Sequence, residues 1–330
     1  MTSTRRLFTT LALAGASLLA LAQAQAQAQS NSYPAKPIRW VVGYPAGGGT
    51  DFLARTVGAQ LSRQLGQPVL VDNRPGAGAS IAADNVAHSP ADGYTVLSAD
   101  NGVLVYNPVL YKKLPYGADK DFSAVGLMGR SPLLIVASPQ AGLADAKALL
   151  AALQRSPGEL SIATAGQGSP HHLALELFQR EFGVKLLHVP YKGGAPALQD
   201  VMGNQVPLMM LDLPSGISAV KAGKVVPLLA LSGERIPQLP QLVTARELGH
   251  PAVEAYTWQG LVLPAATPKD INARLGAELQ KALTDTGVRQ KLFDAGWEAR
   301  PADAADMNRL TDSERKKWQP LIKALGITLD

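Results

Sequence analysis

Three consecutive glycines between an apolar run and a helical pattern constrain the fold of this chain more than any other feature. The run Ile38–Val42 predicts a buried strand, and from Leu53 to Leu65 apolar residues recur every four positions, which predicts one face of a helix. The loop between them is Gly43–Asp51. Glycines let a ligand approach the backbone, and the first N–H groups of a helix are unpaired within it and carry the positive end of its dipole.

This loop admits two interpretations. A tight strand-to-helix turn needs no ligand, whereas an anion site would use the loop N–H groups. A second glycine loop, Gly166–Ser169, lies between the apolar run Leu160–Ala163 and another helical pattern, and it favours the anion site. A branched side chain at Gly48 should then obstruct the ligand and resist the positive φ that we expect there.

Apolar runs and helical patterns alternate along most of the chain, which predicts an α/β fold. Without an N-terminal segment about 300 residues remain, enough for two lobes with separate cores. We expect residues 29–125 and 235–330 to form lobe 1 and residues 126–234 to form lobe 2. The chain should therefore cross twice between the lobes, near Gly126–Ser131 and near Ser232–Leu263.

The N-terminus has the pattern of a removable signal peptide, which we place at residues 1–28. Arg5 and Arg6 precede the apolar segment Leu7–Leu21, which is shorter than the ~20 residues of a membrane-spanning helix. The alanine-rich segment after it offers three cleavage positions (after Ala24, Ala26 or Ala28). The general secretory and twin-arginine routes both stay open. Without cysteine, a lipid anchor and disulfides are excluded, so we expect a free periplasmic protein.

The charge balance argues against a nucleic-acid partner. The chain has 31 basic and 26 acidic side chains, and its net charge of +5 falls to +3 without Arg5 and Arg6. Aromatic residues make up 5% of the chain, which leaves little surface on which bases could stack. No cluster of lysine and arginine alternates with these aromatic residues. We therefore expect no nucleic acid among the partners.

The glycine loops lack the residues that cofactor-binding and catalytic loops need. A Walker loop needs Lys followed by Ser or Thr after its last glycine, and no loop here has them. Arg74–Ile81 begins like a dinucleotide-binding fingerprint, but Ile81 stands where the third glycine or alanine belongs. Ser169 is followed by Pro170, so it does not lie in a G-x-S-x-G nucleophile elbow. We expect no cofactor, no catalytic residue and no enzyme activity.

Two groups of titratable residues allow more than one interpretation. His172 and Glu176 lie four residues apart on one helical face, beside His171, but two ligands do not complete a zinc site, so we expect no metal. Asp51 lies in the first turn of the predicted helix, where a carboxylate interacts favourably with the dipole. Its carboxylate either bonds the N–H groups of its own loop or receives an amine from a ligand, and we favour the first interpretation.

Several segments of the chain have the order and spacing of a known family. They are Gly47–Asp51 with Ala54 and Arg55, Asn73–Ala77, Asp92–Thr95, Leu110–Tyr116 and Val189–Gly193. In these segments the chain resembles the periplasmic receptors of tripartite tricarboxylate transporters, also called the Bug family. The resemblance extends over essentially the whole mature sequence.

This resemblance implies a two-lobe periplasmic binding protein fold, type II-like, with the cleft between the lobes. It also implies a small carboxylic acid as ligand, held by backbone N–H groups and water rather than by an arginine clamp. The contributing positions would be Tyr44, Gly47, Gly48, Gly49, Thr50, Asp51, Gly168, Ser169, His172, Tyr191 and, as a weaker candidate, Asp212. The turn Ser98–Asn101 and Trp258 are candidates for contacting the part of the ligand that lies beyond the bound carboxylate.

The implied partners are the membrane permease subunits of a tripartite transporter, with the receptor as a monomer. Two other functions stay open at this point. A sensory receptor that signals to a membrane kinase would have the same fold and ligand. A periplasmic hydrolase or isomerase would use His172 with Asp51, and it would need a nucleophile or an activated water that the sequence does not display.

Overall fold

The strand Phe122–Ala137 (β4), 16 residues long, joins the two halves of the fold in this computed structural model, which describes residues 33–329. Its first part pairs antiparallel with β9 (Tyr256–Pro264) and β10 (Glu298–Asp303). Its last five residues pair instead with β7 (Leu208–Asp212) and β8 (Val226–Ala230). One strand therefore supplies a central member of the sheet in both lobes, and the predicted α/β fold is confirmed.

Lobe 1 contains the N-terminal strands and the C-terminal helices. Its strands β2 (Val69–Asn73), β1 (Ile38–Val42) and β3 (Thr95–Asp100) are parallel, and β9 is antiparallel to β3. Its helices are α2 (Gly49–Leu65), α3 (Ser80–Ala87), α4 (Asn107–Leu110), α9 (Lys269–Thr284), α10 (Thr286–Asp294) and α11 (Ala304–Ala324). The predicted apolar face of α2 is confirmed, because Leu53, Val57 and Leu61 are buried in one core cluster with Trp40.

Lobe 2 repeats the arrangement of a parallel sheet with flanking helices. The strand β5 (Ser161–Thr164) pairs in parallel with β6 (Leu187–Pro190) on one side and with β7 on the other. Its helices are α5 (Ala146–Arg155), α6 (Pro170–Phe182), α7 (Gly194–Met202) and α8 (Leu213–Lys221). The helices α6, α7 and α8 each begin directly after a strand or a glycine loop, so their N-termini lie at the carboxyl ends of the strands.

The chain passes between the lobes where three backbone segments meet. Leu133 N–H donates to the carbonyl of Ala255 at 3.1 Å, Ala255 N–H donates to Leu231 at 2.8 Å, and Leu231 N–H donates back to Leu133 at 2.8 Å. The boundaries at residues 126 and 235 stay predictions. Ile236 and Leu242 pack in a core cluster of lobe 2, which favours a second boundary nearer Tyr256.

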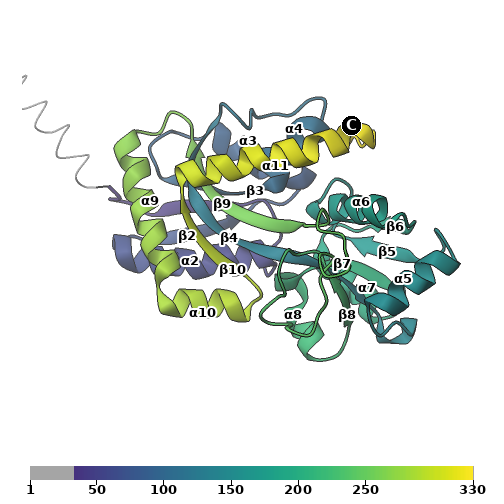
Figure 1. Cartoon of the computed structure of the whole chain (residues 1–330). Helices are drawn as coiled ribbons and strands as arrows, with labels where there is room; N and C mark the ends of the chain where they lie inside the picture. The colour runs from purple at the N-terminus through teal and green to yellow at the C-terminus, as the bar shows by residue number, and fades with distance from the viewer. Residues whose placement is uncertain (1–32, 330) are drawn as a thin grey trace, which may run out of the picture.

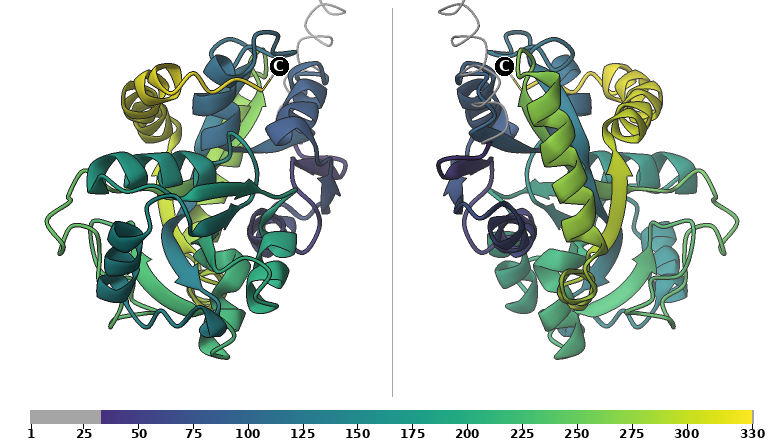
Figure 2. Two further views of the ribbon diagram at one scale, coloured as in Figure 1. Left: turned by 90° about the vertical axis from the view of Figure 1, so that its right-hand side faces the viewer. Right: turned by 90° about the vertical axis from the view of Figure 1, so that its left-hand side faces the viewer.

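The lobes lie side by side in Figure 1, with α2, α9, α10 and α11 in lobe 1 and α5, α6, α7 and α8 in lobe 2. The strands β4 and β9 extend from lobe 1 toward lobe 2. Figure 2 shows lobe 2 in the foreground of the left view and α9 of lobe 1 in the foreground of the right view. Within residues 33–329, none of the helices has the length and apolar character required to cross a membrane. The predicted signal peptide lies outside the described residues.

Candidate functional site

The first glycine loop turns the chain from β1 into α2. Gly47 has a φ of +83°, in the left-handed region that favours glycine. Gly48 is the N-cap of α2 with an ordinary extended backbone (φ −79°), and its carbonyl accepts the N–H of Phe52 at 2.9 Å. Our expectation of a positive φ at Gly48 is therefore wrong. The N-cap position has extended geometry, so the unusual turn falls one residue earlier.

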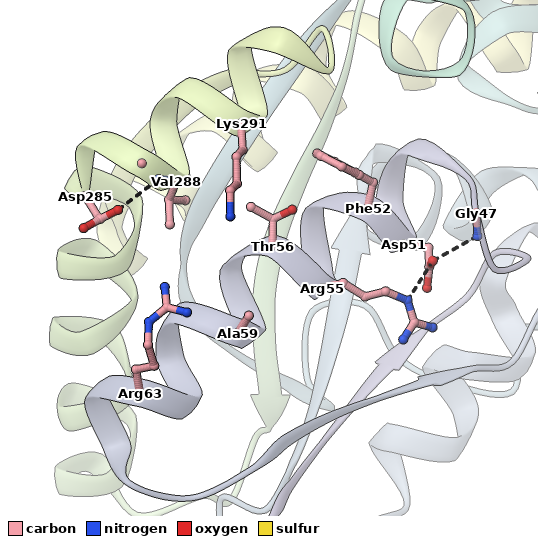
Figure 3. Close-up of a pocket in the computed structure, with 11 residues that line it drawn as sticks. Gly47, Asp51, Phe52, Arg55, Thr56, Ala59, Arg63, Asp285, Val288 and Lys291 are labelled. Carbon is pink, nitrogen blue, oxygen red and sulfur yellow. Dashed lines mark hydrogen bonds and ion pairs between the residues drawn. The ribbon is translucent and has the colours of Figure 1, made fainter.

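Asp51 uses both carboxylate oxygens within lobe 1 (Figure 3). One oxygen accepts the N–H of Gly47 and the Nε of Arg55, each at 2.9 Å, and the other accepts Nδ2 of Asn73 at 2.9 Å. The side chain of Asp51 is 5% exposed. Burial alone would raise the pKa of Asp51, but the bonds from Arg55, Gly47 and Asn73 outweigh burial and lower the pKa below its usual value. These bonds agree with the favoured interpretation, in which Asp51 stabilises its own loop.

Gly49 lies at the boundary between the lobes. A Cβ atom built on Gly49 would lie 2.9 Å from Cβ of Pro214 in α8, and 3.6 Å from Oδ2 of Asp212. On the other side, the Gly49 carbonyl accepts Nε1 of Trp297 at 3.1 Å. Only glycine fits this close approach, because any side chain would push the N-terminus of α2 away from α8.

Tyr44 and Thr50 direct their hydroxyl groups into lobe 1. Tyr44 donates a short hydrogen bond to the carboxylate of Asp100 at the end of β3. Burial raises the pKa of the Tyr44 hydroxyl and the pKa of the Asp100 carboxyl above their usual values. The Thr50 hydroxyl accepts Nε2 of Gln259 from β9 at 3.1 Å. These two residues support the first loop from the lobe 1 side.

The second glycine loop repeats the geometry of the first. Gly168 has a φ of +71°, and its N–H donates to Nδ1 of His172, four residues on, at 3.1 Å. Ser169 is the N-cap of α6, since its hydroxyl accepts the N–H of His172 at 3.3 Å and donates to the carbonyl of Gly166 at 2.6 Å. A Cβ on Gly168 would lie 2.8 Å from Leu329, so the C-terminal segment also contacts this loop.

The two adjacent histidines at the start of α6 have different environments. The ring of His172 stacks on His188 with 4.2 Å between centroids, and its Nε2 lies 3.6 Å from Glu176. Nε2 of His171 bonds Oδ1 of Asp212 at 2.8 Å instead. We predicted His172 as the ligand residue, and it bonds Gly168 and Ser169 of its own loop, whereas His171 is the histidine that reaches Asp212. Within the described residues, no three His, Cys, Asp or Glu side chains are placed to hold a metal ion.

Asp212 lies where several helix N-termini meet. It caps its own helix α8, with Oδ2 accepting the N–H of Ser215 at 3.2 Å and its hydroxyl at 2.8 Å. A Cβ on Gly194, the first residue of α7, would lie 3.8 Å from Oδ1. Although burial alone would raise the pKa of Asp212, the bonds from His171 and Ser215 lower the pKa below its usual value. Asp212 is therefore a buried carboxylate at the lobe boundary.

The remaining predicted residues lie away from this boundary or serve the core. The hydroxyl of Tyr191 donates to Asp200 of α7 at 2.6 Å, and burial together with that bond raises the pKa of Tyr191 to about 12. The Ser98 hydroxyl accepts Nε1 of Trp40 at 2.9 Å, and Trp258 is buried in the core of lobe 1. The structure thus brings Gly49 and Asp212 together, and gives Tyr191 a role within lobe 2.

A family model and a curated relative match this chain over most of its length. The family model described as the tripartite tricarboxylate transporter family receptor matches residues 53–327. Protein BugT of Bordetella pertussis is 33% identical over 301 residues, covering 91% of this chain and 92% of BugT.

Two solved structures are named with a bound carboxylic acid. Rpa4515 of R. palustris with adipate is 33% identical with a TM-score of 0.85, and the match covers 90% of this chain and 99% of that one. MatC of Rhodopseudomonas palustris with bound malate is 33% identical with a TM-score of 0.80, covering 88% of this chain and 100% of that one. The expected family and the expected two-lobe binding-protein fold are confirmed. The chain belongs to the receptor family of the tripartite tricarboxylate transporters.

Proposed function

We propose that this protein is a periplasmic receptor that binds a small carboxylic acid between its lobes and delivers it to the membrane permease subunits of a tripartite transporter. One observation carries the proposal. Among residues 33–329, the backbone N–H groups of Gly48, Gly49 and Thr50 have no hydrogen-bond partner, and they lie at the N-terminus of the 17-residue helix α2 beside lobe 2. Unpaired N–H groups at a helix N-terminus favour an anion.

The neighbouring bonds support this assignment. The Gly47 N–H already donates to Asp51, so it holds the shape of the loop and leaves the next N–H groups for the ligand. Asp51 donates nothing and has Arg55 as its counter-ion, which reduces its repulsion of a ligand carboxylate. The ligand is therefore gripped by backbone rather than by an arginine, and the site selects a carboxylate small enough for the lobes to close over.

The lobe 2 side of the site contributes a different chemistry. The buried carboxylate of Asp212 bonds His171 and Ser215, so its negative charge is shared with donors before any ligand arrives. A ligand carboxylate at α2 and the carboxylate of Asp212 would repel each other unless a water or a ligand hydroxyl lies between them. The named ligands of the relatives, adipate and malate, support a small carboxylic acid as the ligand here.

We further propose that the receptor has no catalytic function, is exported by its signal peptide and acts as a monomer. A hydrolase built on His172 with Asp51 is disfavoured by the bonds of those two residues. Nδ1 of His172 accepts the Gly168 N–H, and both oxygens of Asp51 accept bonds from lobe 1 donors. Neither side chain is free to activate a water.

A thermal-shift screen tests the proposed function directly. The purified receptor would be heated with a panel of carboxylic acids that begins with adipate and malate, with the matching diamides as controls. A ligand at 100 times its dissociation constant adds ~2.7 kcal/mol of stability, which raises the melting temperature by several degrees. Micromolar affinity corresponds to about −8 kcal/mol. A panel in which acids and diamides have the same effect would refute the carboxylate site.

Mass spectrometry of periplasmic material tests the export step. A mature N-terminus after Ala24, Ala26 or Ala28 is expected. An intact N-terminus in the membrane fraction would contradict both the proposed location and the free receptor.

A further inference from the structure

A groove of about 380 Å³ lies between α2 and α10, next to the first glycine loop. Figure 3 shows the side chains of Phe52 and Thr56 on α2 and of Lys291 on α10 extending into the space between the two helices. Ala59 and Val288 add apolar surface to its lining. Phe52 is 40% exposed, and Phe293 of α10 is 41% exposed. A large apolar side chain as exposed as Phe52 on the wall of a groove is typical of an interaction surface.

The charges of this groove are unbalanced toward the positive. Arg55 is paired with Asp51, and the carboxylate of Asp285 accepts the Val288 N–H at 2.9 Å as the N-cap of α10. No carboxylate of residues 33–329 pairs with Arg63 or Lys291, which line opposite walls of the groove. These two exposed cations therefore favour an occupant that carries negative charge.

The groove is coupled to the ligand site and to the lobe boundary. Gly47 and Asp51 line it and also shape the first loop through their hydrogen bond. The helix α10, which forms one wall, also contacts the segment that packs with lobe 2, because the carbonyl of Phe293 accepts a hydrogen bond from Nε2 of Gln238 at 2.9 Å. A partner seated on this surface would touch groups whose positions depend on whether the lobes are closed.

We propose that this groove is the docking surface for a periplasmic segment of the permease that carries carboxylates beside an apolar side chain. The proposal rests on the proposed receptor function. A protein segment fits better than a second small anion, because Arg63 and Lys291 lie on opposite walls and Phe52 adds exposed apolar surface to the groove. Docking here would distinguish the closed receptor from the open one.

The test uses the full-length receptor and proteoliposomes that hold the two membrane subunits of its transporter. The variant R63E/K291E reverses both free cations of the groove. The control K147E/K224E makes the same charge change on exposed lysines of lobe 2. The measurement is the receptor concentration that half-saturates the proteoliposomes. This concentration should be about tenfold higher for R63E/K291E than for the wild type, and unchanged for the control. The docking of the wild type should also weaken as salt rises.

Ligand binding is measured separately, by the melting temperature of each variant with adipate and with malate. Unchanged ligand responses with weakened docking support the proposal, and a permease carrying a compensating Glu→Lys change should restore the docking of R63E/K291E. Equal docking of all variants would overturn the proposal. So would a loss of ligand response with normal docking, which would make the groove part of a small-anion site. A wild type that responds to no carboxylate would refute the receptor function instead, while the docking comparison would still stand.

Discussion

The backbone N–H of Gly47 donates to the carboxylate of Asp51, four residues on, at 2.9 Å. The second loop has the same relationship, because the N–H of Gly168 donates to His172 at 3.1 Å. In both loops the donor is a glycine with positive φ, and the acceptor lies in the first turn of the following helix. The acceptor side chain thus fixes the glycine turn in both loops.

Exchanging Gly48 should therefore affect binding, and exchanging Gly47 should affect folding. At Gly48 the φ of −79° suits any residue, and a new Cβ would lie 3.5 Å from its nearest neighbour, the carbonyl of Pro45. Gly48→Val should abolish ligand-induced stabilisation with a nearly unchanged melting temperature of the free protein. Gly47→Val should destabilise the free protein by ~1 kcal/mol or more, because a branched residue resists a φ of +83°.

Thermal melts with and without the best carboxylate measure both effects. The matched control is Gly66→Val, at a positive-φ glycine of the helix C-cap far from the loop, which should lower stability and leave the ligand-induced shift intact. Normal ligand stabilisation in Gly48→Val would place the carboxylate elsewhere.

The sequence predicts the first loop well because local pattern determines it. A strand, three glycines and a four-residue apolar repeat lie within 28 positions, from Ile38 to Leu65, and no distant residue is needed to place them. The second loop follows by the same reasoning. The position of the positive φ was misplaced by one residue, because the N-cap of α2 depends on which residue begins the helix, and boundaries are poorly encoded in local pattern.

The choice between His171 and His172 could not be made from local pattern. Side chains of adjacent helical residues point about 100° apart, so His171 and His172 cannot both face the lobe boundary. Which one does so depends on the rotation of α6 against β7, whose end carries Asp212 some 40 positions later. A useful signal was present, because Asp212 is a carboxylate directly after a predicted strand and needs a buried donor.

A double-mutant cycle should therefore couple His171, rather than His172, to Asp212. Removing His171 leaves a buried carboxylate without its 2.8 Å donor, which costs on the order of 1–3 kcal/mol. His171→Ala with Asp212→Ala should show an interaction energy of at least about 0.5 kcal/mol, whereas His172→Ala with Asp212→Ala should be additive. Urea denaturation at neutral pH measures both cycles. Equal coupling for the two histidines would contradict the assignment.

The stacked pair His172 and His188 predicts a pH dependence of stability. Burial, followed by the charge of His172, lowers the pKa of His188 from 6.5 to about 4. Glu176 acts in the opposite direction, and Thr164 contacts the ring of His188 at 2.7 Å. The folded state therefore resists a proton that the unfolded state accepts below pH 6.5. The free energy of unfolding should be highest above pH 6.5 and should decline as the pH falls toward 4, by on the order of 2 kcal/mol.

Urea denaturation between pH 4 and pH 7.5 measures this slope. His188→Gln should flatten it in that window, because glutamine does not titrate there. The control His88→Gln should retain the slope, since His88 lies on the exposed face of lobe 1. Carboxylates with a lowered pKa, such as Asp51, begin to lose their contribution below about pH 5, so the wild type and His188→Gln are compared between pH 5 and pH 6.5. An unchanged slope in His188→Gln would assign it to another group.

Ligand binding should close the two lobes, with Gly49 and Pro214 as the contact that limits closure. The structure has the lobes in contact there, since a Cβ on Gly49 would lie 2.9 Å from Pro214, and a Cβ on Gly296 would lie 2.9 Å from Leu213. A ligand that touches both lobes binds this state better than an open one, and only that difference shifts the population.

Small-angle scattering of the wild type should show a smaller radius of gyration with a saturating carboxylate than without it. Gly49→Leu should hold the lobes apart, so its radius should not fall and its affinity should drop by about tenfold or more. Pro214→Gly, added to Gly49→Leu, removes the opposing ring and should restore part of the closure. An unchanged radius of gyration for the wild type at saturation would mean that the pocket is rigid.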